Sequence, residues 1–218
     1  MKLYYIATTR AVRPRWLLEE MGIPYELVRV TPEMSKKAEY QKLHPQLKVP
    51  VLVDESVDPV VTIFESAAIC TYLTDKYPEL EFAPPQNSPQ RAYYYQWLFY
   101  ATNTLEKPVE HFLFAALPKL PEKTIPEKVR FAISTQESLE WFNTVAEPLR
   151  NSLQNQDYLV GNRFTTADIV TGGVLLWAER LKMLNDSDVL SRYLSNLMER
   201  PGFKTADEDF YAAIPPQG

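Results

Sequence analysis

Two residues with complementary chemistry, Glu65 and Ser66, stand side by side before an apolar helical stretch. A hydroxyl residue at the start of a helix ordinarily caps it, and this structural role is the simpler interpretation of Ser66. The functional interpretation is that free N–H groups at the helix start and the hydroxyl bind a carboxylate, while Glu65 meets an ammonium group of the same ligand. The pair is therefore a candidate site for a zwitterionic α-amino acid group.

Thr8, Thr9 and Arg10 form a second candidate site, at the point where the first predicted strand turns into a helix. Hydroxyl groups and the N-terminus of a helix favour a bound anion. The structural alternative assigns the threonines to helix capping, and Arg10 and Arg13, three residues apart, to a solvated basic face. From these residues alone, the structural alternative is the better supported.

A third feature is the Val49-Pro50 pair at the start of another predicted strand. Proline has no N–H, so at the first residue of a strand it costs the ladder no hydrogen bond. Composition alone favours an ordinary trans bond here, because cis bonds are only a few per cent of X-Pro bonds in folded proteins.

The single cysteine, Cys70, cannot form a disulfide within the chain. It lies on the apolar side of a predicted helix, where a buried small hydrophobe is a simpler interpretation than a redox residue. The chain has no CxxC motif, which disfavours a dithiol redox enzyme. The two histidines, His44 and His111, are far from Cys70 in sequence, so no zinc or other metal site is expected.

The elements that must position these residues begin with a strand-helix-strand unit. A strand over 2–6, a helix that ends at Gly22 and a strand over 25–30 predict a parallel pair. Two further strands joined by the turn DESVDP predict a hairpin, and the helix over 66–77 follows it. This order, βαβ then ββα, predicts a small mixed sheet flanked by helices.

Beyond a proline-rich stretch, the sequence changes character and shows no strand pattern. Long helical stretches are predicted over 91–117, 127–155, 166–184 and 187–199. Thr165 and Asp168 have the spacing of a capping box in front of the third of these, which is interpreted as a buried core helix. We therefore expect an α/β domain over 1–80, a linker over 81–89 and an all-helical domain over 90–218.

Composition excludes several classes of protein. The chain has 218 residues and a formal net charge of -5, which argues against nucleic acid as a partner. No apolar run approaches the roughly 20 residues of a membrane span, and the first residues show no signal peptide. A single cysteine fits a reducing, cytoplasmic setting.

Taken in order, these motifs resemble those of the glutathione transferase family over nearly the whole chain. The stretch HPQLKVPVL is similar to the family's NPxGKVPxL, FESAAICTYL to ESxAIxxYL, and LVGNRFTTADI to the FSxAD region. One such match carries little weight, but three in the right order are specific. The resemblance implies a thioredoxin-like N-terminal domain followed by an all-helical domain, a homodimer, and glutathione as co-substrate.

The resemblance also implies roles for particular residues. Pro50 would be cis and the backbone of Val49 would pair with the cysteinyl part of glutathione. Glu65 and Ser66 would bind the γ-glutamyl end, and Lys48 would lie near the glycine carboxylate. In the helical domain, the first long helix would line the pocket for the electrophile, with Tyr93, Tyr94, Trp97 and Tyr100.

Two departures from the family's pattern bear on function. The family activates the thiol with Tyr, Ser or Cys near the first helix, where this chain has Thr8, Thr9 and Arg10; His44-Pro-Gln-Leu replaces Asn-Pro-x-Gly. The main hypothesis is a detoxifying transferase that conjugates glutathione to small apolar electrophiles. The alternatives are a glutathione-dependent disulfide or peroxide reductase and a non-catalytic interaction module on the same fold.

Overall fold

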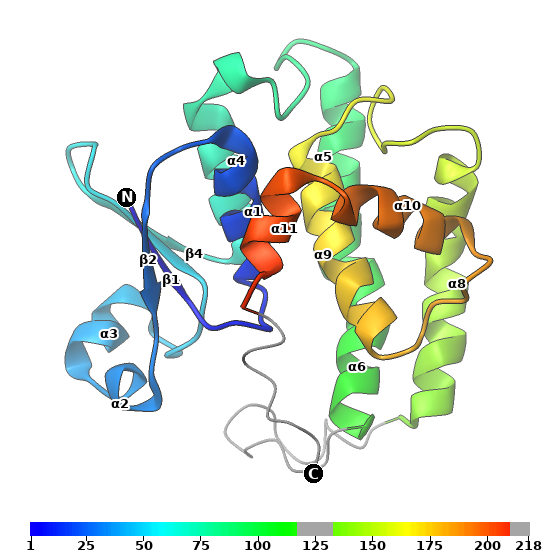
Figure 1. Cartoon of the computed structure of the whole chain (residues 1–218), viewed down its shortest axis with the longest axis horizontal. Coiled ribbons are helices and arrows are strands. Elements are labelled where there is room, and N and C mark those ends of the chain that lie inside the picture. Colours follow the sequence, from blue (N-terminus) through cyan, green and yellow to red (C-terminus); the bar gives the residue numbers. More distant parts are fainter. Residues whose placement is uncertain (117–132, 210–218) are drawn as a thin grey trace. The chain divides into compact units, whose positions relative to one another are not determined.

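The computed structural model describes residues 1–116 and 133–209 of the chain (Figure 1). The chain divides into two compact units: one joins residues 1–83 to the chain from residue 197 on, and the other spans 84–196. The first unit holds the sheet and the second is helical, so the predicted fold class, a thioredoxin-like α/β part followed by an all-helical part, is confirmed. The predicted domain limits at 80 and 90 stay predictions.

The first unit contains the strands and the helices that flank them. Its described elements are β1 (Lys2–Tyr5), α1 (Val12–Met21), β2 (Glu26–Arg29), α2 (Pro32–Ser35), α3 (Ala38–Leu43), β3 (Val51–Asp54), β4 (Val61–Phe64), α4 (Ser66–Lys76), η1 (Pro78–Leu80) and α11 (Pro201–Asp207).

The sheet has the strand order β2-β1-β3-β4. β1 and β2 are parallel, as the strand-helix-strand pattern predicted, and β3 and β4 form the predicted antiparallel hairpin. At the centre, Leu3 of β1 pairs with Leu52 of β3, and both side chains are fully buried. Burial of these apolar side chains gives the two central strands their place in the core.

Helix α1 ends where the sequence predicted, at Gly22. This residue adopts φ 64°, a left-handed conformation that glycine reaches without a Cβ clash, and its N–H bonds to the carbonyls of Leu18 and Glu19. The same helix packs against α4 and against α11. Beside the second of these, Arg200 donates Nε and Nη2 to the two carboxylate oxygens of Glu20 at 2.9 and 2.7 Å, a paired geometry that is stronger than a single ion contact.

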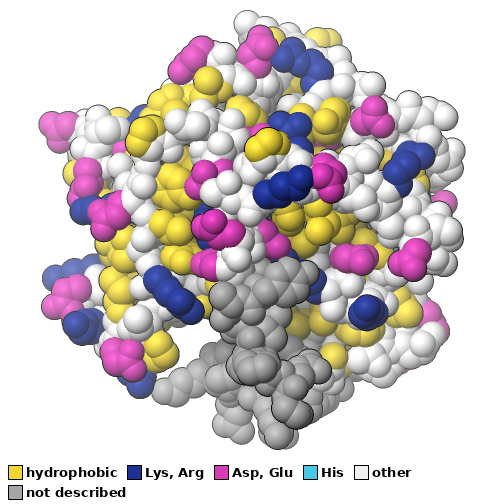
Figure 2. Space-filling view, viewed as in Figure 1, with side chains coloured by type: hydrophobic (Ala, Val, Ile, Leu, Met, Phe, Trp, Pro, Cys, Tyr) yellow, Lys and Arg dark blue, Asp and Glu magenta, His cyan; other side chains and the backbone are white. Residues whose placement is uncertain are grey.

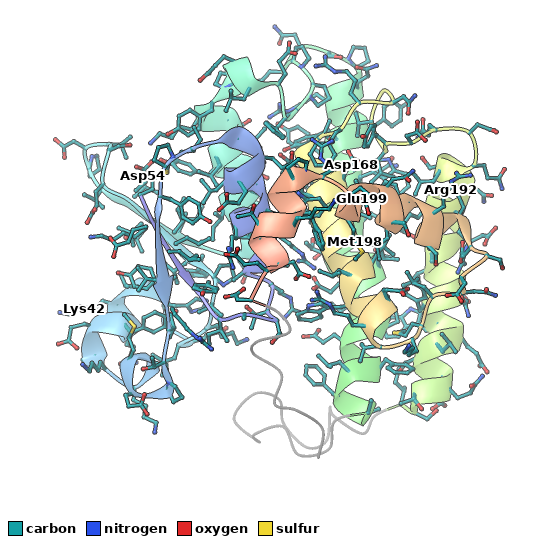
Figure 3. All side chains as sticks on the ribbon, in the orientation of Figure 1. Lys42, Asp54, Asp168, Arg192, Met198 and Glu199 are labelled. Carbon is teal, nitrogen blue, oxygen red and sulfur yellow. The ribbon has the colours of Figure 1, made fainter. Side chains whose placement is uncertain are left out.

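Asp54 joins the end of β3 to the end of α4 (Figure 3). Its fully buried carboxylate accepts hydrogen bonds from Lys76, from the Tyr72 hydroxyl at 2.7 Å and from the backbone and hydroxyl of Ser56. Burial disfavours the charged form, but these donors outweigh it and lower the pKa of Asp54. The hairpin turn and α4 are thereby held together at the end of the sheet away from Pro50.

The second unit is built from helices. Its described elements are α5 (Gln90–Tyr100), the π-helical segment η2 (Ala101–Leu105), α6 (Glu106–Ala116), α8 (Thr135–Leu153), α9 (Thr166–Arg180) and α10 (Val189–Met198). The division between the two units falls within the last residues of α10. The predicted helix over 127–155 is described from Thr135 on, and its first part lies outside the described residues. Twelve of the fifteen residues of α9 are buried, so its prediction as the core helix is confirmed.

Two capping boxes begin helices in this unit, one buried and one exposed. Asp168 is fully buried (Figure 3) and accepts from the N–H groups of Leu159 and Thr165 at 2.9 and 2.8 Å, and from the hydroxyls of Thr165 and Tyr193. Its counterpart on α8, Glu137, is exposed and accepts hydrogen bonds from the backbone and hydroxyl of Ser134. The chemistry of the two boxes is similar, but only the first satisfies donors that water cannot reach.

Replacing Asp168 is therefore expected to cost far more stability than replacing Glu137. We expect Asp168→Ala to lower the free energy of unfolding by about 3 kcal/mol, because it removes a cap and leaves buried donors unpaired. Glu137→Ala should cost less than about 1 kcal/mol. Urea titration followed by far-ultraviolet circular dichroism measures both, and equal midpoints for the two variants would contradict the assignment.

Candidate functional site

Strand register brings three of the predicted site segments to one end of the sheet. Val51, the first residue of β3, pairs with Tyr4 of β1 and with Phe64 of β4, and both pairings are antiparallel. The residues before Val51 and those after Tyr4 and Phe64 therefore leave the sheet at the same end. Segments 8–10, 48–50 and 65–66 are thus neighbours, although up to 58 residues separate them in the chain.

The segment before β3 has the backbone geometry that the family resemblance implied. The Val49-Pro50 bond is cis, in place of the trans bond that composition alone favoured. Pro50 is buried, Val49 is half-buried, and the exposed Lys48 offers its carbonyl to the Tyr40 hydroxyl at 2.7 Å. A second cis bond, Asp58-Pro59, lies in the hairpin turn.

The structure contradicts the prediction that the Ser66 hydroxyl caps α4. Glu65, exposed and at φ 74°, occupies the N-cap position, and its carbonyl accepts the N–H of Ile69 at 2.9 Å. Ser66 is the first helical residue, so the interpretation of its hydroxyl as the cap of α4 is wrong. The Ser66 hydroxyl instead accepts a hydrogen bond from Nη1 of Arg13 at 3.2 Å.

Arg13 is the residue that sequence reasoning missed. It was interpreted as part of a solvated basic face, but it is only 1% exposed, so that interpretation is wrong. A signal was present, because Arg13 shares a helix face with Trp16 and Leu17, three and four residues on, and both are buried. A buried guanidinium beside the start of α4 gives this end of the sheet a fixed positive charge.

The threonines before α1 are placed differently from the capping prediction. α1 starts at Val12 with Ala11 at its N-cap and no side-chain cap, so neither threonine caps it and that prediction is wrong. Thr9 donates its hydroxyl to the carbonyl of Ile6 at 2.6 Å and accepts the N–H of Ala11 at 3.3 Å. The hydroxyl of Thr9 is thus used in a local turn before α1 and not in a cap of the helix.

Thr8 and Arg10 flank that turn. Thr8 is exposed and has φ 69°, a left-handed conformation that is unusual for a β-branched residue and marks a strained position. Within residues 1–116 and 133–209, no group hydrogen-bonds to the Thr8 hydroxyl, whereas the proton of the Thr9 hydroxyl is already donated. Arg10 is half-buried.

Comparison with known proteins identifies the family. Residues 9–76 match the glutathione S-transferase N-terminal domain, and residues 111–201 match the glutathione S-transferase C-terminal domain. This chain belongs to the glutathione S-transferase family. Both of its domains are present in the family's order, which is the order that the sequence motifs indicated.

Individual relatives agree with that assignment. It is 29% identical to the glutathione S-transferase GstA of Escherichia coli O157:H7 over 211 residues, which is 94% of this chain and 96% of the relative. It is 26% identical over 226 residues to the disulfide-bond oxidoreductase YghU of Escherichia coli K12, covering 94% of this chain and 73% of that one.

Solved structures give the same fold. The bacterial transferase BphK, solved as a ternary complex, is 26% identical, with a TM-score of 0.77, and covers 97% of this chain and 100% of its own. A glutathione transferase from Methylococcus capsulatus, 24% identical, shares the fold with a TM-score of 0.79 over 97% of this chain and 98% of its own.

The remaining predicted site residues of this family member lie on α5, in the second unit. Tyr93 is 58% exposed, Trp97 is 6% exposed and Tyr100 is half-buried. The rings of Trp97 and Tyr100 meet edge to face with centroids 5.3 Å apart, whereas Tyr94 is fully buried. Their role as the lining of an electrophile pocket stays a prediction.

Metal-binding clusters and membrane-spanning helices are absent from the part of the chain that the structure describes. It contains no group of three or more His, Cys, Asp or Glu side chains placed to hold a metal ion. None of its helices is long and apolar enough to cross a membrane. On the face that Figure 2 draws, Lys and Arg side chains lie interspersed with Asp and Glu.

Proposed function

We propose that this protein is a glutathione transferase that conjugates the thiolate of glutathione to small apolar electrophiles. The observation that carries the proposal is the convergence of three segments at one end of the sheet, each with polar groups suited to one part of the tripeptide. The backbone of Val49 would pair with the cysteinyl unit, Glu65 and Ser66 would hold the γ-glutamyl end, and Lys48 would neutralise the glycine carboxylate.

We propose that the Thr8 hydroxyl stabilises the thiolate of glutathione by a hydrogen bond and that the positive charge of Arg10 assists it. A free thiol ionises near pH 8.5, so a mostly ionised thiol at neutral pH needs about 3 kcal/mol of stabilisation. One hydrogen bond to a charged group supplies about 1.5–3 kcal/mol. The Thr8 hydroxyl is the better donor, because Thr9 would first have to give up its bond to the carbonyl of Ile6.

The chemical step then needs no protein nucleophile. The thiol proton leaves to solvent, the thiolate sulfur forms a bond to the electrophilic carbon, and the leaving group departs with its electron pair. The protein's contribution is to hold the thiolate beside the electrophile. We propose that Tyr93, Trp97 and Tyr100 line the pocket for that electrophile. We also propose that the enzyme serves detoxification in the cytoplasm, where cysteine thiols are kept reduced.

Glutathione binding is expected to be saturable in calorimetric titration, and a thiolate band should appear near neutral pH by ultraviolet difference absorption. Thr8→Ala should raise the pKa of the bound thiol by about one unit or more, whereas the matched Thr8→Ser variant should keep it.

The signal is unambiguous because the protein's own thiol stays neutral. Burial raises the pKa of Cys70 to about 12, so Cys70 adds no thiolate band near neutral pH. An unchanged pKa in Thr8→Ala would remove Thr8 from the mechanism. No binding at millimolar glutathione would favour the non-catalytic interaction module instead.

A second candidate function is glutathione-dependent reduction of disulfides or peroxides. The observation that favours it is the similarity to the disulfide-bond oxidoreductase YghU along 94% of this chain. Rates on an aryl halide and on a small glutathione-mixed disulfide separate the two functions. We expect the aryl halide to be the better substrate. A faster reaction with the disulfide would show that the function is reduction and not conjugation.

We further propose that the protein is a homodimer. Support comes from α5, where Tyr95 and Phe99, one helical turn apart, are 40% and 65% exposed. Light scattering should give twice the chain mass of 25.2 kDa, and Phe99→Asp should shift the protein toward the mass of one chain. A single-chain mass for the unaltered protein would contradict the proposal.

A further inference from the structure

His44 closes the turn that leads into the Lys48–Pro50 segment. It follows α3 and is only 4% exposed. Its Nδ1 atom accepts the backbone N–H of Gln46 at 3.2 Å, and its carbonyl accepts the N–H of Leu47 at 2.9 Å. The side chain thus acts as an Asn or Asp side chain does in an Asx turn, by accepting the N–H two residues on.

This turn depends on those hydrogen bonds because its last residue is strained. Leu47 adopts φ 57°, a left-handed conformation that residues with a Cβ rarely occupy, and it is 41% exposed. Packing around Leu47 therefore contributes little to holding it there. The two bonds of His44 restrain the backbone immediately before Lys48 and Val49.

The ring of His44 also contacts the strand that leads into the Glu65–Ser66 segment. Its ring lies against the ring of Phe64, with centroids 4.5 Å apart and planes inclined by 35°. Phe64 is the last residue of β4, directly before Glu65. One buried side chain therefore touches both the turn before Lys48 and the strand end that carries Glu65 and Ser66.

Protonation would remove this function of His44. A neutral imidazole has one nitrogen that accepts, whereas the imidazolium donates from both nitrogens and cannot accept the Gln46 N–H. Among the described residues, the charged groups that act on the ring are Glu65, directly after β4, and Lys48 in the turn. Burial and Lys48 lower the pKa of His44, and Glu65 opposes them, so the ring is neutral at pH 7.

We propose that neutral His44 is a positioning residue for glutathione, which holds the Lys48–Pro50 and Glu65–Ser66 segments in their binding geometry and releases them when it is protonated. This inference rests on the proposed function. Binding should be at full strength above the pKa of His44 and should be lost as the pH falls through it. By linkage, saturating glutathione must lower the pKa of His44 further.

The test compares glutathione affinity between pH 7 and pH 5 in matched variants. Asn accepts the same N–H but does not titrate, so His44→Asn should bind like the unaltered protein at pH 7. Phe keeps the ring against Phe64 but has no acceptor, so His44→Phe should bind about tenfold more weakly at every pH. Leu47→Gly relieves the strain without touching the acceptor and is the control for backbone effects.

The unaltered protein and Leu47→Gly should lose up to about tenfold in affinity over this range, and His44→Asn should lose less than about twofold. Proton NMR of the imidazole gives the second readout. The chain has two histidines, so the signal missing in His44→Asn is that of His44. Saturating glutathione should lower its pKa by up to about one unit, which equals the tenfold change in affinity.

The outcomes separate this inference from the proposed function. Suppose that the unaltered protein binds glutathione, while His44→Asn loses as much affinity between pH 7 and pH 5 as the unaltered protein does, or while the pKa of His44 stays the same on binding. In either case His44 is not the positioning residue, and the transferase proposal stands. If the unaltered protein does not bind glutathione at pH 7, the proposed function and this inference are both overturned.

Discussion

The register of β3 between β1 and β4 is the constraint on which the candidate site depends. Val51 is paired on both sides, so the segments next to it, next to Tyr5 and next to Phe64 leave the sheet together. A slip of one residue would turn the side chains of β3 to the opposite face. All four residues of β3 are buried, so that slip would disrupt the packing on both faces and would take Asp54 away from Tyr72 and Lys76.

A second layer of support comes from α1, which contacts both the site and the last described residues of the chain. Arg13 contacts Ser66 from this helix, while Arg15, two residues on, forms ion pairs with Glu208 and Asp209 at 2.7 and 2.8 Å. Trp16 packs edge to face against Phe203 of α11, with centroids 5.1 Å apart. The helix that carries the site's buried cation is therefore anchored by residues from the far end of the sequence.

Competition for hydrogen bonds explains how neighbouring residues of one type acquire different chemistry. Thr8 and Thr9 have the same side chain, but Thr9 closes a local turn with Ile6 and Ala11. Ser66 likewise gives up the capping role expected of a serine before a helix, because the backbone of Glu65 occupies the N-cap position. In both cases the position of the helix start, and not the residue type, decides what the hydroxyl can do.

Local signals in the sequence determined the elements of this protein. The helix end at Gly22, the hairpin, helix α4 and the capping box at Asp168 each depend on residues a few positions apart, and each was predicted correctly. The motifs around Pro50 and Glu65 also indicated the family. Only the tertiary structure decided that Arg13 and His44 are buried, that Arg13 contacts Ser66, and that α11 joins the unit of the sheet. The physical reason is distance along the chain: Arg13 and Ser66 are 53 positions apart and His44 and Phe64 are 20 apart, so a local pattern can show that a helix face is buried but not which residue packs against it.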